Sequence, residues 1–115
     1  ELNLTDIYFD TDSAVLAADG KAKLQNIAKV VTAAMAKDSS YRLNLSGHAD
    51  ARGSDAYNLA LSLRRAKAAK AYLTKLGVPA SKLTIQAEGE AKPAADNVSK
   101  EGQAKNRRVE VRVAR

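Results

Sequence analysis

The alternation of two hydrophobic periods along the chain constrains its fold more than any other feature. Segments with apolar residues at helical spacing alternate with short segments in which every second residue is apolar, in the order strand, helix, strand, helix, strand, loop, strand. Each helical segment is long enough to let the strands on either side of it pair in parallel. The pattern predicts an α/β fold, an α+β sandwich of βαβαββ order in which two main helices cover one face of a mixed four-stranded sheet. It does not give the order of the strands.

Two amphipathic segments are predicted to form the helices. The first runs from about Ala18 to Lys37, and the second follows Ser54 and stops at Gly77. The apolar face expected on the first helix comprises Leu24, Ile27, Ala28, Val31, Ala34 and Met35. The core stripe expected on the second comprises Leu59, Leu63, Ala66, Ala69, Leu73 and Leu76.

Four short segments carry the strand pattern. The first, Ile7–Phe9, ends at the turn-forming residues 10–13. The other three alternate apolar and polar side chains, with apolar positions at Tyr41, Leu43 and Leu45, at Leu83, Ile85 and Ala87, and at Val109, Val111 and Val113. The stretch from Gly89 to Asn106 is long and polar, and loops of that length in a compact domain are often functional.

Composition narrows the class of protein. At 115 residues, with 45% hydrophobic and 28% charged residues, we expect one domain over residues 1–115. The absence of cysteine excludes disulfides and thiolate metal sites. Because the first residues, Glu1 to Leu4, do not resemble an export signal, we interpret the chain as a mature fragment. The net charge of +6 favours an anionic partner such as nucleic acid, lipid headgroups or a carboxylate-rich polymer.

The segment from Gly47 to Ser54 leaves a strand and enters a helix, and it carries the most informative residues. Its small residues and glycines let the backbone approach a ligand closely. One stripe of the following helix comprises Asn58, Leu61, Ser62 and Arg65. At the helical repeat this stripe is centred roughly 110° from the core stripe, so we expect it to line a groove beside the core.

Asp50 in this segment and Arg65 on the helix predict a site with both signs of charge. An arginine can hold a carboxylate through two parallel hydrogen bonds, and an aspartate can accept from an ammonium group. A ligand with an amino-acid end group would satisfy both. The alternative is that Asp50 and Arg65 pair with each other or cap helices, and their spacing alone does not decide between the two.

Catalytic and metal-binding alternatives have little support in the sequence. A zinc site would need carboxylates beside His48, the single histidine, which we instead expect to fix the loop through hydrogen bonds. Asp10 and Asp12 resemble the opening of a calcium loop, but Ala14 and Val15 follow where an oxygen ligand and a glycine are needed. Because nucleophile elbows and phosphate-binding glycine loops are also missing, we expect neither an enzyme nor a cofactor.

From Ile7 to Val113 the chain resembles the OmpA-like C-terminal peptidoglycan-binding family. The matching residues are Ile7-x-Phe9 with Ser13 and Leu16; then Gly47-His48-x-Asp50-x-x-Gly53, Asn58, Leu61-Ser62, Arg65-Ala66 and Tyr72-Leu73; and finally Pro93, Asn97, Gly102 and Asn106-Arg107-Arg108-Val109-Glu110. The chain departs from the family at Ala49, where many members have threonine.

The resemblance implies binding to the stem peptide of peptidoglycan through diaminopimelate, whose side chain ends in free amino and carboxyl groups. It implies that Asp50 contacts the ammonium, that Arg65 contacts the carboxylate, and that the backbone of Phe9, Asp10 and Thr11 helps to hold the ligand. The residues implied to line or support the groove are Asn58, Leu61, Ser62 and Arg107, with Gly47, His48 and Gly53 supporting the loop.

The resemblance also implies a periplasmic module that anchors an outer-membrane or envelope protein to the cell wall. Any membrane attachment would come from parts of the parent protein outside this chain, and the parent type and oligomeric state stay open. The runner-up is a basic nucleic-acid-binding α/β domain, suggested by Arg64, Lys67 and Lys70, although the aromatic residues that stack on RNA are missing. A wall-cleaving enzyme has less support still, and we expect no nucleic-acid partner.

Overall fold

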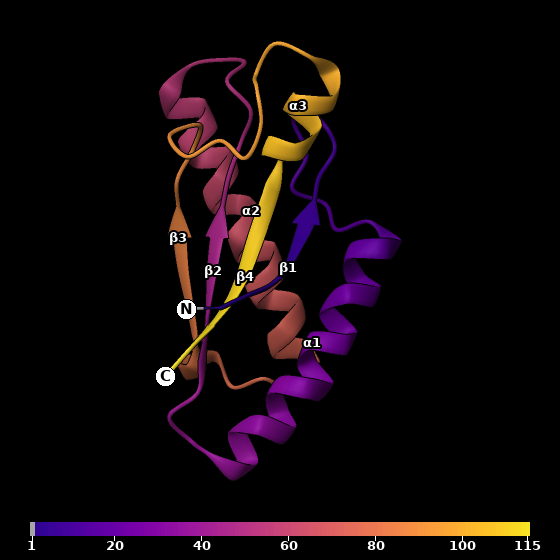
Figure 1. Ribbon diagram of the computed structural model, residues 1–115, viewed down its shortest axis with the longest axis vertical. Coiled ribbons are helices and arrows are strands. Elements are labelled where there is room, and N and C mark those ends of the chain that lie inside the picture. The colour runs from indigo at the N-terminus through magenta and orange to yellow at the C-terminus, as the bar shows by residue number, and fades with distance from the viewer. Residues whose placement is uncertain (1) are drawn as a thin grey trace.

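The predicted α/β fold is confirmed by the computed structural model, which describes residues 2–115 (Figure 1). The elements are β1 (Leu2–Tyr8), α1 (Ala18–Lys37), β2 (Arg42–Gly47), α2 (Asp55–Lys75), the short 3-10 helix η1 (Ala80–Lys82), β3 (Leu83–Ala87), α3 (Lys100–Asn106) and β4 (Arg108–Ala114). The predicted bounds of the first helix agree with those of α1. The first strand is longer than predicted and ends one residue before Phe9. Among residues 2–115, no helix combines the length and the apolar character needed to span a bilayer.

The four strands form one mixed sheet in the order β1-β4-β2-β3. Strand β4 pairs antiparallel with both β1 and β2, whereas β2 and β3 pair in parallel. The two strands that α1 connects are therefore separated by the last strand of the chain. As a result, the ends of β1, β2 and β3 and the beginning of β4 all lie at one end of the sheet, the upper end in Figure 1.

Helices α1 and α2 pack on one face of the sheet and share a single apolar core with it. The buried residues of that core are Ile7, Phe9, Leu24, Ala28, Val31, Leu43, Leu45, Ala69, Leu73, Val78, Leu83, Val109 and Val111. The opposite face of the sheet presents polar side chains, among them Ser46, Gln86, Glu110 and Arg112. This division follows from the period-two alternation of the strands.

The core stripe predicted for α2 is confirmed in the middle of the helix but is wrong at its two ends. Leu59 is 50% exposed and Leu76 is 36% exposed. In the first half of α2 the interior is instead occupied by the stripe expected to line a groove, which consists of Asn58, Leu61, Ser62 and Arg65, all buried. The reason is that this half of α2 packs against loops, whose exposed peptide groups need polar partners.

The stretch from Gly89 to Asn106 is not a continuous loop, because its last residues form α3. Ser99 caps the start of this helix, because its hydroxyl accepts a hydrogen bond from the amide of Gly102. It buries Gly102 and Asn106 rather than an apolar face. The hydrophobic period that identified the longer helices is therefore absent from α3.

Gly47 lets the end of β2 lie against α2. A Cβ atom at this position would stand 1.9 Å from the backbone oxygen of Ser62, so no side chain fits. Helix α2 begins at Ser54, whose side chain accepts a hydrogen bond from the amide of Tyr57. Just before it, Gly53 has a φ of +89°, a conformation that glycine adopts without strain. Both glycines thus fix the loop at residues 48–54 against the start of α2.

Candidate functional site

A cavity of about 290 Å³ lies at the upper end of the molecule, where the β1–α1 loop (residues 9–17) meets the β2–α2 loop (residues 48–54) and the start of α2. We call it the site cavity. Its lining residues are Thr11, Asp12, Ala49, Asp50, Arg52, Gly53, Tyr57, Asn58, Leu61 and Arg65. Loops that follow neighbouring strands commonly carry binding sites because the sheet holds them rigidly together.

The Asp50 carboxylate is buried in the β2–α2 loop and is held by two arginines. Its Oδ1 accepts from the amide and the Nε of Arg52 at 3.0 and 3.1 Å, and its Oδ2 accepts from Arg52 Nη2 at 2.8 Å and from Arg107 Nη1 at 3.4 Å. Burial alone would raise the pKa of Asp50, but the hydrogen bonds and positive charges of these arginines outweigh it and lower the pKa. The carboxylate is therefore ionised at neutral pH.

Arg65 has no exposed surface and connects three segments through backbone oxygens. Its Nε donates to the oxygen of Ser13 at 2.8 Å, Nη1 to that of His48 at 2.9 Å, and Nη2 to that of Asp10 at 3.0 Å. The guanidinium also lies 5.4 Å from the centre of the Phe9 ring. Burial, followed by repulsion from Arg107, lowers the pKa of Arg65 to about 10, so the group stays charged at neutral pH.

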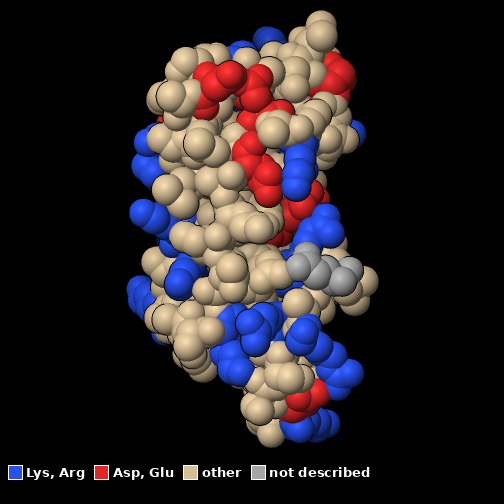
Figure 2. Space-filling view, turned by 90° about the vertical axis from the view of Figure 1, so that its left-hand side faces the viewer, with Lys and Arg blue, Asp and Glu red and all other residues tan. Residues whose placement is uncertain are grey.

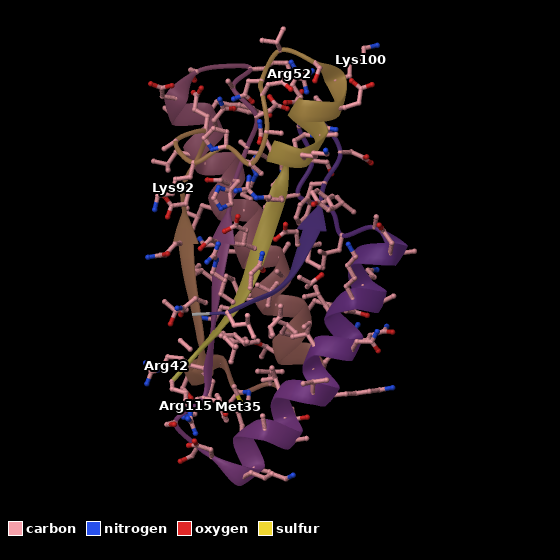
Figure 3. All side chains as sticks on the ribbon, viewed as in Figure 1. Met35, Arg42, Arg52, Lys92, Lys100 and Arg115 are labelled. Carbon is pink, nitrogen blue, oxygen red and sulfur yellow. The ribbon has the colours of Figure 1, made fainter. Side chains whose placement is uncertain are left out.

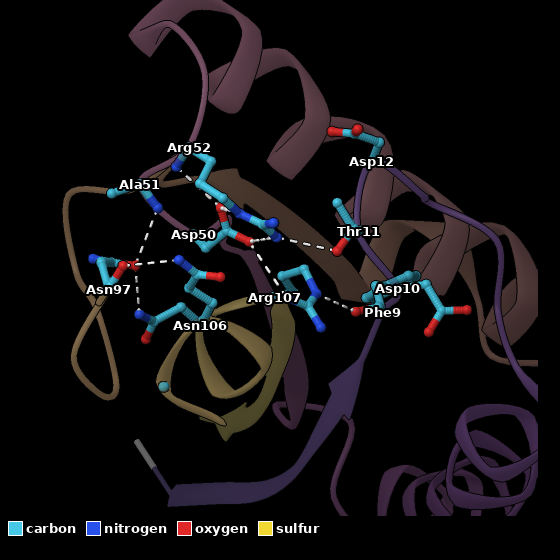
Figure 4. A network of polar contacts seen from close by, with 12 residues as sticks. Phe9, Asp10, Thr11, Asp12, Asp50, Ala51, Arg52, Asn97, Asn106 and Arg107 are labelled. Carbon is cyan, nitrogen blue, oxygen red and sulfur yellow. Dashed lines mark hydrogen bonds and ion pairs between the residues drawn. The ribbon is translucent and has the colours of Figure 1, made fainter. Parts of the chain in front are cut away.

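Arg65 and Asp50 line the same cavity without pairing directly. The alternative that they pair with each other or cap helices therefore does not describe their contacts. Arg107 connects them indirectly. Its Nε donates to the backbone oxygen of Phe9 at 2.9 Å while Nη1 reaches Asp50 (Figure 4). The site cavity therefore holds the carboxylates of Asp12 and Asp50 and the guanidinium groups of Arg52 and Arg65, with Arg107 reaching Asp50 from the side.

The structure divides the predicted site residues between two neighbouring cavities. Thr11, Asp50, Gly53, Asn58, Leu61 and Arg65 line the site cavity. Phe9, Asp10 and Arg107 line an adjoining groove of about 490 Å³. Ser62 lines neither; its hydroxyl donates to the oxygen of Leu59 and accepts from the amide of Gly89. Gly47 acts through the close approach of β2 to α2.

His48 fixes the loop through its backbone, whereas the prediction of a hydrogen-bonding side chain is not met. Its amide donates to the oxygen of Arg108 at 2.8 Å. The buried ring has no hydrogen-bond partner at either nitrogen among the described residues, and Nε2 lies 3.7 Å from Glu110 Oε1. Burial, and then the charge of Arg108, lower the pKa of His48. The ring faces a polar pocket on the other side of the sheet, away from the site cavity.

Arg52, Asp12 and Tyr57 were not predicted as site residues, yet they line the site cavity. Arg52 Nη2 donates to the hydroxyl of Thr11 at 3.1 Å, and the hydroxyl of Tyr57 donates to Asp12 Oδ1 at 3.0 Å. Both contacts join the β1–α1 loop to the other side of the cavity. A signal for Arg52 was available, since it lies two residues from Asp50 in a segment of otherwise small residues.

Hydrogen bonds that involve Asn97 and Asn106 hold the β2–α2 loop (Figure 4). Asn97 Oδ1 accepts from the amide of Ala51 at 3.1 Å and from Asn106 Nδ2 at 2.8 Å. Asn106 Oδ1 in turn accepts from the amides of Ala94 and Ala95. We call these contacts the asparagine clamp. It explains why the polar stretch before β4 matters to the site although it contributes no lining residue to the site cavity.

Within the described part of the chain, no three His, Cys, Asp or Glu side chains are grouped to hold a metal ion. The chemistry that the cavity offers is hydrogen bonding by charged groups of both signs. Such a site can recognise a polar ligand; we find no assembled acid, base and nucleophile in it.

Comparison with known proteins shows the family of this chain and agrees with its fold. A sequence model described as "OmpA family" matches residues 8–107. Outer membrane porin F of Pseudomonas fluorescens is 40% identical over 94% of the chain and 32% of its own length. The peptidoglycan-associated lipoprotein of Rhizobium meliloti is 42% identical over 81% of the chain and 52% of its own length. The chain thus spans about a third to a half of these relatives.

Solved structures show the same fold. The peptidoglycan-associated lipoprotein from Burkholderia pseudomallei superposes with a TM-score of 0.87 at 30% identity, over 95% of this chain and 89% of that one. The C-terminal domain of Helicobacter pylori MotB superposes with a TM-score of 0.86 at 24% identity, over 97% of this chain and 85% of that one. On the strength of the match across residues 8–107, the chain belongs to the OmpA family.

Proposed function

We propose that this chain binds peptidoglycan non-covalently through the diaminopimelate of the stem peptide. The observation that carries the proposal is that the Asp50 carboxylate and the Arg65 guanidinium line one cavity. Relatives named as peptidoglycan-associated lipoproteins support the same class of ligand. The end of a diaminopimelate side chain carries one ammonium and one carboxylate, which matches the two signs of charge.

In this proposal Asp50 accepts from the ammonium group and Arg65 donates to the carboxylate. Three of the five N–H groups of Arg65 are used by backbone oxygens, which leaves one on each terminal nitrogen for a ligand. Asn58 and Leu61 line the cavity, and the backbone of residues 9–11 helps to hold the ligand. Arg107 keeps Asp50 in place, while Gly47, His48, Gly53 and Ser62 hold the surrounding backbone.

We propose further that the domain acts in the periplasm and anchors an outer-membrane or envelope protein to the cell wall. The names of relatives, which include an outer membrane porin and lipoproteins, support this location. The affinity of one small site would be multiplied by the many copies of the same peptide in the wall polymer.

The test is sedimentation of the protein with purified sacculi. We expect wild type to pellet, free diaminopimelate to compete, and Asp50→Asn to remain in the supernatant because the amide no longer attracts an ammonium. Arg65→Lys should also lose most binding, because an ammonium cannot replace the fork of a guanidinium. Circular dichroism would verify that both variants are folded.

Asp38→Asn is the matched control, since it removes a carboxylate at the distant end of α1. It should pellet like wild type. If folded Asp50→Asn and Arg65→Lys both retained full binding, the proposed site would be wrong. If wild type ignored sacculi under all conditions, the proposed function itself would fail.

A further inference from the structure

We propose that Arg52 is a displaceable latch on the site cavity: it occupies Asp50 in the free protein, and the ammonium group of the ligand must replace it. This inference rests on the proposed function and adds a determinant of its specificity. Binding then depends on the ammonium group of the ligand, because the Arg52 guanidinium already occupies the Asp50 carboxylate that receives this ammonium.

The contacts of Arg52 place it where the ligand's ammonium is expected. Its Nε and Nη2 bind the two carboxylate oxygens of Asp50 at 3.1 and 2.8 Å, which is a bidentate pair. The same Nη2 donates to Thr11 at 3.1 Å, so the side chain reaches from the β2–α2 loop across to the β1–α1 loop (Figure 4). A ligand that approaches Asp50 therefore meets Arg52 first.

Arg52 is the arginine that can move, and Arg107 is the one that cannot. The Arg52 side chain is 48% exposed, so water can take over its hydrogen bonds when it turns outwards. The Arg107 side chain is only 15% exposed and is anchored to the oxygen of Phe9, and its contact with Asp50 is longer. Displacement of Arg52 thus leaves Arg107 as the remaining arginine on Asp50 and frees the carboxylate to accept hydrogen bonds from the ligand.

Displacement of Arg52 also fits the position of Arg65. Arg65 lines the same cavity as Asp50 and Arg52. Outward movement of Arg52 breaks its contact with Thr11 and removes one of the two guanidinium groups that contact Asp50. A zwitterionic end group restores the balance, because its ammonium takes the place of the departing cation while its carboxylate reaches Arg65.

The test compares two ligands by NMR titration of the labelled domain: diaminopimelate and pimelate, which has the same chain without the amino groups. Arg52→Ala should lower the dissociation constant for diaminopimelate roughly two- to fivefold, the size expected for loss of one partly exposed ion pair. It should not tighten the binding of pimelate. Arg42→Ala removes an equal charge at the opposite end of the molecule (Figure 3) and should change neither value.

Several results would overturn the latch. Weaker binding of diaminopimelate by Arg52→Ala would make Arg52 a ligand contact, and equal tightening for both ligands would remove the link to the ammonium group. In an Asp50→Asn background, Arg52→Ala should have no effect on diaminopimelate. If wild type binds sacculi and Asp50→Asn does not, while Arg52→Ala tightens nothing, the latch is wrong and the proposed function stands; if wild type binds neither ligand nor sacculi, both fail.

Discussion

At the scale of single residues, the site depends on a charged group kept inside the protein. Arg65 is stabilised by three backbone oxygens and the face of Phe9 rather than by a carboxylate. Carbonyl dipoles solvate the cation without neutralising it, so its charge remains available to a ligand. This arrangement separates two tasks, since Arg65 joins three segments while Asp50 pairs with Arg52 and Arg107.

Removal of the Arg65 side chain should destabilise the fold strongly. In Arg65→Ala three backbone oxygens lose their donors and a buried space is left empty, and we expect the free energy of unfolding to fall by about 3 to 5 kcal/mol. Arg65→Lys should recover only part of this, because a compact ammonium cannot reach all three oxygens. Urea denaturation measures both values. As a control, Arg64→Ala at the exposed neighbouring position should change the free energy of unfolding by less than about 0.5 kcal/mol. An equal loss in Arg64→Ala and Arg65→Ala would contradict the role given to Arg65.

Asp50 should make stability depend on acid pH. Because its pKa lies below the ordinary value of 3.8 in the folded protein, the ionised form contributes stability that is complete above that value. The contribution disappears as the pH falls through the lower, folded pKa. We therefore expect wild type to be more stable than Asp50→Asn by a constant amount between about pH 5 and 7, with the difference shrinking below about pH 4. A difference that stayed constant down to pH 2 in urea titrations would show that the charge of Asp50 contributes nothing.

At the scale of elements, α2 changes its packing partner along its length. Its second half packs Ala69 and Leu73 into the apolar core, and its first half packs Asn58, Ser62 and Arg65 against loops. Hydrophobic periodicity predicted the second half correctly, because apolar burial is what that pattern reports. It misplaced Leu59 on the core side, because the buried surface in the first half is made of peptide groups.

The other elements show which features of the fold could be predicted from the sequence and which could not. The bounds of α1 followed from its regular apolar face. Asp50 and Arg65, which were predicted to form one site, line the same cavity. The position of β4 between β1 and β2 could not be predicted, since alternation within a strand does not encode its neighbour. The helix α3 was missed because capping by Ser99 and burial of Asn106 hold it in place of an apolar stripe.

The asparagine clamp gives a prediction for these elements. In Asn106→Ala, the amides of Ala94 and Ala95 lose their acceptor and Asn97 loses a donor. We expect faster hydrogen exchange at these two amides and at Ala51, with unchanged protection in β2 and β4. Binding to sacculi should weaken several-fold because the β2–α2 loop is less ordered. Unaltered exchange at Ala94 and Ala95 would mean that the clamp does not restrain the loops.

At the scale of the whole molecule, a group of exposed basic residues and the binding site lie towards opposite ends of the long axis. The molecule extends 44 × 25 × 20 Å, and α2 runs for 21 residues from the site towards the opposite end. On the face in Figure 2, lysine and arginine gather over the lower part and acidic residues over the upper part. The exposed residues Lys37, Arg42 and Lys75 lie at the ends of α1, β2 and α2 away from the site (Figure 1).

This separation predicts that the net charge affects binding only at low salt. The variant Lys37→Gln, Arg42→Gln, Lys75→Gln removes half of the formal charge of +6. The Debye length is about 8 Å at 0.15 M salt, far shorter than the molecule, so the dissociation constant for sacculi should change by less than about twofold. At roughly 0.02 M salt, where screening extends over about 20 Å, the variant should bind more weakly. Arg107→Gln, which removes a charge beside Asp50, should weaken binding at both salt concentrations. Equal weakening by the triple variant at 0.15 M would show that the basic end touches the wall directly.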